Sequence, residues 1–387
     1  MKTVFTSEAV TCGHPDKVCD QIADAVLDAL LEQDPESRCA CEVTAASNHV
    51  HVFGEITTQA VINIEKIVRD TVTNIGYDRP ELGFDGNTAE VDIDLHAQSP
   101  DIARGISREG ERLDEGAGDQ GMMFGYACAQ TPSLMPLPLE LAQALCRRLE
   151  QVRRSGELTY LRPDGKAQVS VEYVDGTPVR VSTIVLSSQH EDSVPISLLR
   201  QELIEHVIDP VIPARYIDGE TQIFINPTGR FVLGGPAADS GLTGRKLIVD
   251  SYGGFARHGG GAFSGKDPSK VDRSAAYMAR YIAKNVVAAH LAGECEVQLS
   301  YAIGLAEPVS VNIETFGSER VDRDVLEHAV RSCVDMRPAA IIERFQLKEP
   351  IYSAVSCYGH FGRNAADMPW ERLDLADQLV LACYQRA

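Results

Sequence analysis

The fold is constrained most by a pattern that occurs three times along the chain. Each occurrence has a helix-like segment, two segments that alternate apolar and polar residues, and a second helix-like segment. The alternating segments flank turns at 47–48, 175–176 and 307–308, which lie roughly 130 residues apart, as expected of an internal repeat. We therefore expect an α+β fold of three units, each with helices on one face of an antiparallel or mixed sheet.

The composition is that of a globular protein with more than one core. A chain of 387 residues, of which 44% are hydrophobic and 24% charged, suggests two or three domains of about 150 residues each. Acidic residues outnumber basic residues by 56 to 36. Because proteins that bind nucleic acid need a broad basic face, we expect no nucleic-acid partner.

Apolar runs and cysteines exclude further classes. No run of apolar residues is long enough to span a bilayer, and the opening MKTVFTSEAV lacks the pattern of a signal peptide. We therefore expect a cytoplasmic protein without a membrane partner. The ten cysteines contain no C-x-x-C pair, which favours reduced thiols in the core over a zinc site.

A glycine-rich basic segment, GGGAFSGKDPSK at 259–270, predicts a site for a polyphosphate. Glycines let several backbone N–H groups converge on one anion, and Lys266 and Lys270 add positive charge. The spelling resembles a P-loop, but Asp267 stands where a P-loop needs Ser or Thr to reach Mg²⁺. A glycine-rich surface loop is the alternative.

The first predicted helix carries both an apolar stripe and an acidic ridge. Pro15 suits its first turn, and apolar residues recur every four positions from Val18. Asp16 lies beside His14 at the helix N-terminus, where a carboxylate could hold a cation that carries phosphate oxygens, or could simply cap the helix. Ridge residues 20, 24 and 28, also aspartates, are interpreted as solvated surface.

Polar residues on predicted strands and turns form a second set of candidates. Glu42 and Glu55 lie on the polar face or at the end of the first hairpin, and either could be plain surface. Residues 99–121 have no periodicity and end in GAGDQG, which indicates either a loop that closes over a site or a disordered insertion. Asp164 lies in a PDG turn, an ordinary turn spelling.

Seven motifs in one order give the chain a resemblance to a known family. The motifs are GHPDK at 13–17, GEITT at 54–58, GAGDQG at 116–121, RPDGK at 162–166, GRFVLGGP at 229–236, GLTGRK at 241–246 and GGGAFSGKDPSKVDRSAAY at 259–277. Together they resemble S-adenosylmethionine synthetase (methionine adenosyltransferase) of the bacterial type, over nearly the whole chain. The resemblance implies three intertwined, pseudo-symmetric β-α-β-β-α-β repeats, at 1–102, 115–234 and 235–376, with a mobile active-site loop at 98–114.

The resemblance also implies a reaction and its partners. Methionine sulfur attacks C5′ of ATP, and the released triphosphate is hydrolysed to pyrophosphate and phosphate. Because a thioether has no proton to lose, the barrier lies in alignment and in charge on the triphosphate. The family uses Mg²⁺, two ions per active site, and K⁺. It forms homo-oligomers with active sites at the dimer interface, usually as homotetramers that are dimers of dimers.

Residue roles follow from the same resemblance, motif by motif. The catalytic residues it implies are His14, Lys166, Arg245 and Lys266. The residues implied to bind ATP are His14, Asp119, Asp164, Lys166, Arg230, Phe231, Asp239, Arg245, Lys246, Ala262 and Lys266. Those implied to bind methionine are Glu55, Gln98, Asp239 and Lys270. The metal ligands it implies are Asp16 and Asp272 for Mg²⁺ and Glu42 for K⁺.

Two other functions compete with this interpretation. A phosphotransferase would use the glycine-rich segment as a P-loop, against which Asp267 and the lack of a preceding buried parallel strand argue. A non-catalytic nucleotide-binding or scaffold protein would need no aligned methionine pocket. In that protein Glu55 and Gln98 could be replaced without effect on ATP binding.

Overall fold

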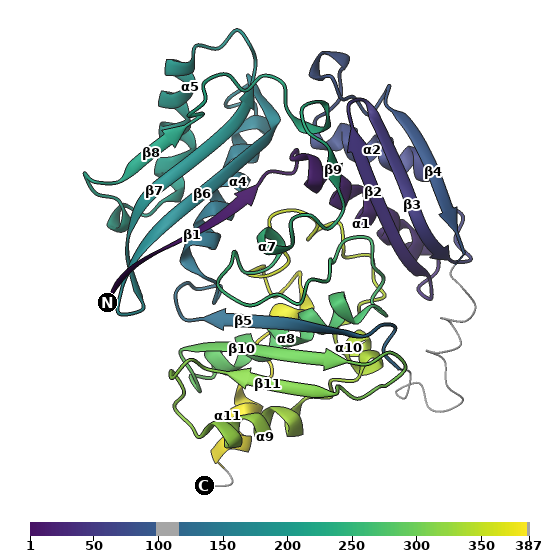
Figure 1. The fold of residues 1–387 in the computed structure, drawn as a ribbon, viewed down its shortest axis with the longest axis vertical. Helices are drawn as coiled ribbons and strands as arrows, with labels where there is room; N and C mark the ends of the chain where they lie inside the picture. The colour runs from purple at the N-terminus through teal and green to yellow at the C-terminus, as the bar shows by residue number, and fades with distance from the viewer. Residues whose placement is uncertain (98–115, 385–387) are drawn as a thin grey trace.

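The computed structural model describes residues 1–97 and 116–384, in which three β-sheets pack against helices (Figure 1). The predicted α+β fold with three sheets is confirmed. The first sheet, of order β4-β3-β2-β9, comprises β2 (Arg38–Ala46), β3 (His49–Thr57), β4 (Glu90–His96) and β9 (Gly241–Leu242). The second, of order β1-β6-β7-β8, comprises β1 (Lys2–Val10), β6 (Leu161–Val174), β7 (Thr177–His190) and β8 (Gln222–Ile225). The third, of order β11-β10-β5, comprises β5 (Gly121–Cys128), β10 (Glu294–Tyr301) and β11 (Ser310–Glu314).

Helices connect the strands and cover the sheets. The long helices are α1 (Pro15–Gln33), α2 (Ile64–Ile75), α4 (Leu137–Arg154) and α8 (Val271–Ala288). The shorter ones are α5 (Ile196–Leu203), α6 (Asp209–Val211), α7 (Leu247–Asp250), α9 (Arg323–Cys333), α10 (Pro338–Phe345) and α11 (Ala376–Tyr384). In Figure 1, α1 and α2 lie behind the strands of the first sheet, whose other face is turned to the viewer.

Each sheet contains one strand from a part of the chain that is distant in sequence. β1 pairs antiparallel with β6, β5 with β10, and β9 with β2. Each of these strands precedes a helix that packs on another sheet: α1 packs on β2, α4 on β6, and α8 on β5 and β10. The three units are therefore interlocked in a cycle, and none of them buries its sheet alone.

Local sequence signals set the helix ends. Pro15 is in the first turn of α1, as predicted, and the apolar stripe that begins at Val18 is buried. Helix α2 starts at Ile64, where the Asn63 side chain accepts a hydrogen bond from the Lys66 N–H. It ends at Gly76, whose φ of 115° lies in the left-handed region that favours glycine.

The interpretation of the acidic ridge on α1 as solvated surface was wrong. Asp20 and Asp24 have no exposed surface, and Asp28 is half-buried. All three accept hydrogen bonds from backbone N–H groups between residues 244 and 353. Spacing alone could not separate these two outcomes, because a paired buried carboxylate and a solvated one recur with the same helical period.

The third unit departs from the other two in its described part. Its sheet has two strands of its own, β10 and β11, plus β5, and the described residues add no fourth strand after α9. Residues 302–309 connect β10 to β11, a longer link than a tight turn at 307–308. In the part of the chain that the structure describes, none of the helices has the length and apolar character needed to cross a membrane.

Candidate active site

The candidate residues form two groups. We call His14, Asp16, Asp164, Lys166, Asp239, Arg245 and Lys246 the helix-end group, because they surround the N-terminus of α1. We call Glu42, Glu55, Lys266 and Asp272 the sheet-face group, because the first three share the helix-free face of the first sheet. Within residues 1–97 and 116–384, no hydrogen bond or ion pair joins a member of one group to a member of the other.

Asp16 organises the helix-end group. It lies in the first turn of α1 and is buried. Its Oδ1 accepts a hydrogen bond from the Leu242 N–H at 3.1 Å, and its Oδ2 accepts one from Lys246 Nζ at 2.6 Å. Burial by itself would raise the pKa of Asp16, but the bond and the charge of Lys246 lower it below its ordinary value. The ionised carboxylate therefore fixes residues 241–246 over the helix end.

His14 caps the same helix as a neutral imidazole. Its Nδ1 accepts a hydrogen bond from the Asp16 N–H at 3.2 Å. Burial, followed by the positive charge of Lys246, lowers the pKa of His14 to about 3. A neutral ring whose Nδ1 is an acceptor carries its proton on Nε2. His14 therefore offers one N–H donor at the helix end.

The start of β6 is packed directly against this helix end. A Cβ added at Gly13 would lie 2.3 Å from the backbone carbon of Pro163, so only glycine allows the approach. The Thr11 N–H donates to the Gly165 carbonyl at 3.0 Å, which ties the end of β1 to the same strand. Residues 163–166 are thereby placed beside His14.

Asp164 and Lys166 are the charged residues that β6 contributes to the helix-end group. Asp164 is buried, its Oδ2 accepts a hydrogen bond from the Gly235 N–H at 2.8 Å, and burial raises its pKa to about 6. Lys166 is exposed, and its charge contributes to the lowered pKa of His14. The charge of Asp239, which is exposed, contributes to the raised pKa of Asp164.

Strand register assembles the sheet-face group. Ala40 of β2 lies opposite Glu55 of β3 on one side and opposite Lys266 on the other. Directly opposite residues project from the same face of a sheet, so Glu55 and Lys266 share the helix-free face with Glu42, two residues further along β2. Burial raises the pKa of Glu42, and a hydrogen bond with Thr243 and the charge of Lys266 oppose that rise.

Lys266 also links this face to the start of α8. Its Nζ lies 2.8 Å from Asp272 Oδ2, in the first turn of that helix. Gly261 is pressed against the same carboxylate, because a Cβ there would lie 2.2 Å from Asp272 Cγ. The glycine-rich segment therefore wraps around an ion pair.

This segment is not a P-loop. α8 begins at Val271, four residues after Asp267, rather than at the lysine. Asp267 is fully buried, and its Oδ2 accepts hydrogen bonds from the Cys39 N–H at 2.7 Å and from Lys270 Nζ at 2.5 Å. Asp267 thus binds the segment to β2 and faces no open phosphate site, while Lys270 keeps its ammonium on Asp267.

The other predicted residues lie at the margins of the two groups. Arg230 forms an ion pair with Asp192, and the Phe231 N–H donates to His190 Nε2 at 3.1 Å. Ala262 is packed against Gly244. A Cβ added at Gly244 would lie 2.6 Å from the Cβ of Ala262. Asp119 is exposed. Gln98 and the predicted loop at 98–114 lie outside the described residues.

Residue-level reasoning missed a buried charge network beneath the helix-end group. Lys17 Nζ lies 2.6 Å from Asp250 Oδ1 and 2.9 Å from Asp20 Oδ2. Asp20 Oδ1 accepts a hydrogen bond from the Gly244 N–H at 2.9 Å. The Asp ridge was a visible signal, but nothing in the sequence joined it to partners more than 200 residues away.

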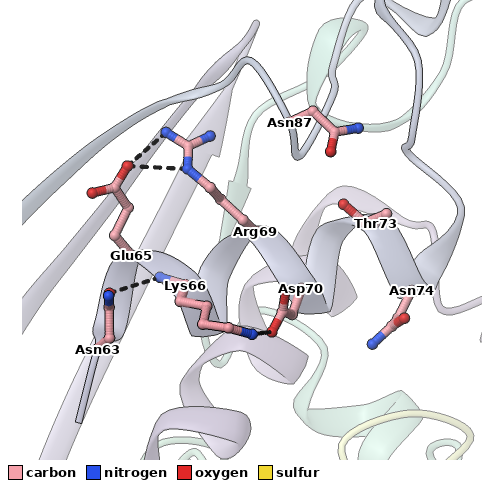
Figure 2. A pocket seen from close by; sticks show the side chains of 8 residues that line it. All are labelled: Asn63, Glu65, Lys66, Arg69, Asp70, Thr73, Asn74 and Asn87. Carbon is pink, nitrogen blue, oxygen red and sulfur yellow. Dashed lines mark hydrogen bonds and ion pairs between the residues drawn. The ribbon is translucent and has the colours of Figure 1, made fainter.

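A large hollow of the surface lies away from the candidate residues. This hollow of about 710 Å³ lies beside α2. Figure 2 shows the side chains that line it, which are Asn63, Glu65, Lys66, Arg69, Asp70, Thr73, Asn74 and Asn87. Its charged side chains neutralise one another, because Glu65 pairs with Arg69 and Lys66 with Asp70. A cavity of about 10 Å³ beside Asp272 is too small for a substrate.

Cationic side chains set against single carboxylates, next to a helix end and a glycine-rich segment, are the arrangement expected of an enzyme that binds a polyphosphate. Models of the N-terminal, central and C-terminal domains of S-adenosylmethionine synthetase match residues 2–100, 114–231 and 233–372. These matches span nearly the whole chain, which therefore belongs to the S-adenosylmethionine synthetase family. Its activity is that of a methionine adenosyltransferase, which forms S-adenosyl-L-methionine from ATP and L-methionine.

Proposed function

We propose that the helix-end group and the sheet-face group bind the triphosphate of ATP and align methionine for attack on C5′. The observation that carries the proposal is the arrangement around Asp16, where Lys246 and Arg245 lie within 2.6 Å and 3.6 Å of one carboxylate at a helix N-terminus. Together with Lys166 and Lys266, these residues would offset the charge that develops on the departing triphosphate. Ala262, Arg230, Phe231, Asp119 and Asp164 complete the proposed nucleotide contacts.

His14 has a defined part in this proposal. Because its pKa is lowered to about 3 by burial, the ring is neutral at neutral pH and donates through Nε2. A neutral donor can hydrogen-bond the departing oxygen without giving up a proton. The attack itself needs no base, since the thioether sulfur carries no hydrogen, and water exclusion and alignment set the rate.

The carboxylates available for Mg²⁺ fit that ion. Asp16 and Asp272 each form an ion pair with a lysine. Among the described residues, no three His, Cys, Asp or Glu side chains lie close enough together to hold a metal ion by themselves. Mg²⁺ usually takes one or two protein carboxylates and completes its shell with phosphate oxygens and water. Bound in this way, two Mg²⁺ ions would neutralise phosphate charge.

Glu42 fits a monovalent cation in a similar way. It is half-buried on β2, and its carboxylate is hydrogen-bonded with Thr243. Oxygen ligands of this kind suit a hard cation, and we propose K⁺. Burial raises the pKa of Glu42, so a bound cation would also restore its ionised form.

The methionine site is proposed at Glu55, Gln98, Asp239 and Lys270. Glu55 lies on the helix-free sheet face, 3.4 Å from His96 Nε2 through its Oε1, and could receive the ammonium of the substrate. The ammonium of Lys270 is hydrogen-bonded to Asp267. We propose that its positive charge acts on the substrate carboxylate or on phosphate from that position. Asp239 belongs to the helix-end group, whereas Glu55 belongs to the sheet-face group. A methionine site that uses both residues therefore needs the two groups to lie side by side.

We propose that they meet between two copies of the chain, as a homodimer that pairs into a homotetramer. The lack of a direct bond between the two groups in the described residues supports this assembly, as do apolar side chains exposed on the sheets, such as Val4 and Phe224 at 56% and 44%. Interfaces between subunits commonly cover such side chains.

The finer organisation of the chain is part of the same proposal. We propose three pseudo-symmetric β-α-β-β-α-β repeats at 1–102, 115–234 and 235–376, with residues 98–114 closing the site, in a family member of the bacterial type. The repeated order of strand, helix, hairpin and helix supports the repeats. A cytoplasmic location is supported by ten cysteines, all of them described and none in a disulfide.

The experiment that tests the chemistry measures S-adenosylmethionine, pyrophosphate and phosphate together by mass spectrometry, with ATP, methionine, Mg²⁺ and K⁺ present. We expect equal amounts of all three products, none without methionine, loss of turnover without Mg²⁺ and slower turnover without K⁺. Release of ADP would favour a phosphotransferase. Unchanged turnover after Mg²⁺ removal would contradict the proposed ligands Asp16 and Asp272.

A further inference from the structure

The acidic ridge of α1 accepts hydrogen bonds from a row of backbone N–H groups between residues 242 and 353. Asp16 accepts a hydrogen bond from the N–H of Leu242, and Asp20 from that of Gly244. Further along the helix, Asp24 accepts from the N–H of Gly265, and Asp28 from those of Tyr352 and Ser353. One helix thereby fixes several segments, and the segments held by Asp16 and Asp24 carry the proposed phosphate-binding lysines.

Asp24 holds the backbone on both sides of Lys266. Its Oδ1 accepts a hydrogen bond from the Gly265 N–H at 2.9 Å, and both of its oxygens accept from Arg273, at 2.7 Å and 2.8 Å. Arg273 Nη1 also donates to the Lys266 carbonyl at 3.3 Å. The side chains of Asp24 and Arg273 have no exposed surface, so water offers neither of them another partner.

This clamp adds to the hydrogen bonds by which the backbone of Gly265 and Asp267 is joined to β2. Gly265 has a φ of 79°, and glycine reaches this region at no cost, along with many other conformations. The Gly265 N–H is held by Asp24 and the Lys266 carbonyl by Arg273, and these two hydrogen bonds restrict that freedom. The long lysine side chain then starts from a defined position beside Asp272.

We propose that Asp24 is a positioning residue for Lys266. Through Gly265 and Arg273 it places the Lys266 ammonium where the triphosphate of ATP binds, without touching the substrate itself. The inference rests on the phosphate-binding role proposed above for Lys266. It predicts that loss of the Asp24 carboxylate lowers kcat even when the chain stays folded, because the ammonium is preorganised less well.

The test is a double-mutant cycle of Asp24→Asn and Lys266→Ala, with kcat for S-adenosylmethionine formation as the readout. Asparagine keeps the shape of Asp24 but loses the charge and one of the two acceptors for Arg273. In the wild-type background, we expect Asp24→Asn to lower kcat at least about tenfold. In the Lys266→Ala background, we expect the same substitution to lower kcat by less than about twofold. A purely structural effect would lower the kcat of both proteins by the same factor and would overturn the inference.

Asp28→Asn is the matched control, because Asp28 lies on the same ridge and, like Asp24, accepts hydrogen bonds from backbone N–H groups distant in sequence. We expect it to lower the midpoint of thermal unfolding while kcat stays within twofold of wild type. If Asp24→Asn does not fold, Arg273→Lys replaces it in the cycle, since lysine keeps the charge but cannot hold both oxygens and the Lys266 carbonyl.

The outcomes separate this inference from the proposed site. If Lys266→Ala keeps full activity, the phosphate role of Lys266 fails, and the inference fails with it. If Lys266→Ala is impaired but the effect of Asp24→Asn multiplies with it, the site stands and the positioning role of Asp24 is overturned. If the effect of Asp24→Asn is lost in the Lys266→Ala protein, both stand.

Discussion

Lys266 is the residue on which most of the proposed chemistry of the sheet-face group depends. Its ammonium is paired with Asp272 at 2.8 Å, and both side chains are about one-fifth exposed, at 21%. A cation in this position is poorly screened by water but still reachable by a substrate. Its charge is therefore worth more to a bound triphosphate than that of a lysine on the open surface.

We expect Lys266→Ala to lower kcat by about 10²- to 10³-fold, a loss like that of a preorganised donor in other active sites. The measurement is the initial rate of S-adenosylmethionine formation at saturating ATP and methionine. Lys66→Ala is the control, because Lys66 is an exposed lysine on α2 that pairs with Asp70. A Lys266→Ala enzyme within tenfold of wild type would rule out the phosphate role.

Asp164 makes the stability of the protein depend on pH. Burial raises its pKa from the ordinary 3.8 of an aspartate to about 6. Between these two values the folded state binds a proton at Asp164 that the unfolded state has released. The contribution of Asp164 to stability is therefore complete below pH 3.8 and is lost as the pH rises toward 6.

Asp164→Asn tests this effect, because asparagine is neutral at every pH and can still accept from the Gly235 N–H. We expect the free energy of unfolding of the variant, relative to that of wild type, to be higher at pH 7 than at pH 4 by about 2 kcal/mol. Urea unfolding at both pH values measures it. A constant difference between the two proteins would show that the pKa of Asp164 is not raised.

At the scale of elements, residues 265–267 act as a short extra strand of the first sheet. The Cys41 N–H donates to the Gly265 carbonyl at 3.0 Å, and the Asp267 N–H donates to the Cys39 carbonyl at 3.0 Å. This stretch and β9 lie along β2, at Cys39–Cys41 and at Thr44–Ala45. A segment of the third unit therefore completes the sheet of the first.

We expect Gly265→Ala to lower the free energy of unfolding by about 1–3 kcal/mol, because alanine is strained at a φ of 79°. Its Cβ would also lie 1.9 Å from the Cys41 carbonyl oxygen, which forces the segment away from β2. Denaturant unfolding measures the change. Gly219→Ala, where a Cβ meets nothing within 4 Å, should stay within about 0.5 kcal/mol of wild type.

At the scale of the whole molecule, the placement of the two groups bears on the proposed dimer. The helix-end group lies around the start of α1, and the sheet-face group lies on the open face of the first sheet. The groups have no direct bond to each other in the described parts of the chain. We propose that one triphosphate uses both groups, one of them supplied by a second copy of the chain.

Complementation between two inactive variants tests this arrangement. Lys246→Ala disables the helix-end group and Lys266→Ala the sheet-face group. If each site combines one group from each chain, a mixed dimer has one intact site, and random mixing restores about a quarter of the wild-type activity. Co-expression followed by a kcat measurement gives the answer. No recovery would place each site within a single chain.

The sequence by itself determined the local elements and the chemistry they carry. The alternation of apolar residues located the three hairpins, and Pro15 marked the start of a helix, because these signals act between neighbouring residues. The motifs that carry His14, Asp16, Lys266 and Asp272 were also legible in the chain. The family that they pointed to is confirmed by matches to all three of its domains.

Only the tertiary structure decided how those elements were joined and which polar groups were buried. Nothing in β1, β5 or β9 says that each pairs with the sheet of another unit, because a strand's pattern gives its faces and not its neighbours. The ridge aspartates were misjudged for the same reason. Their partners lie 224 to 325 residues away, and a carboxylate stays buried only where such partners replace the hydrogen bonds of water.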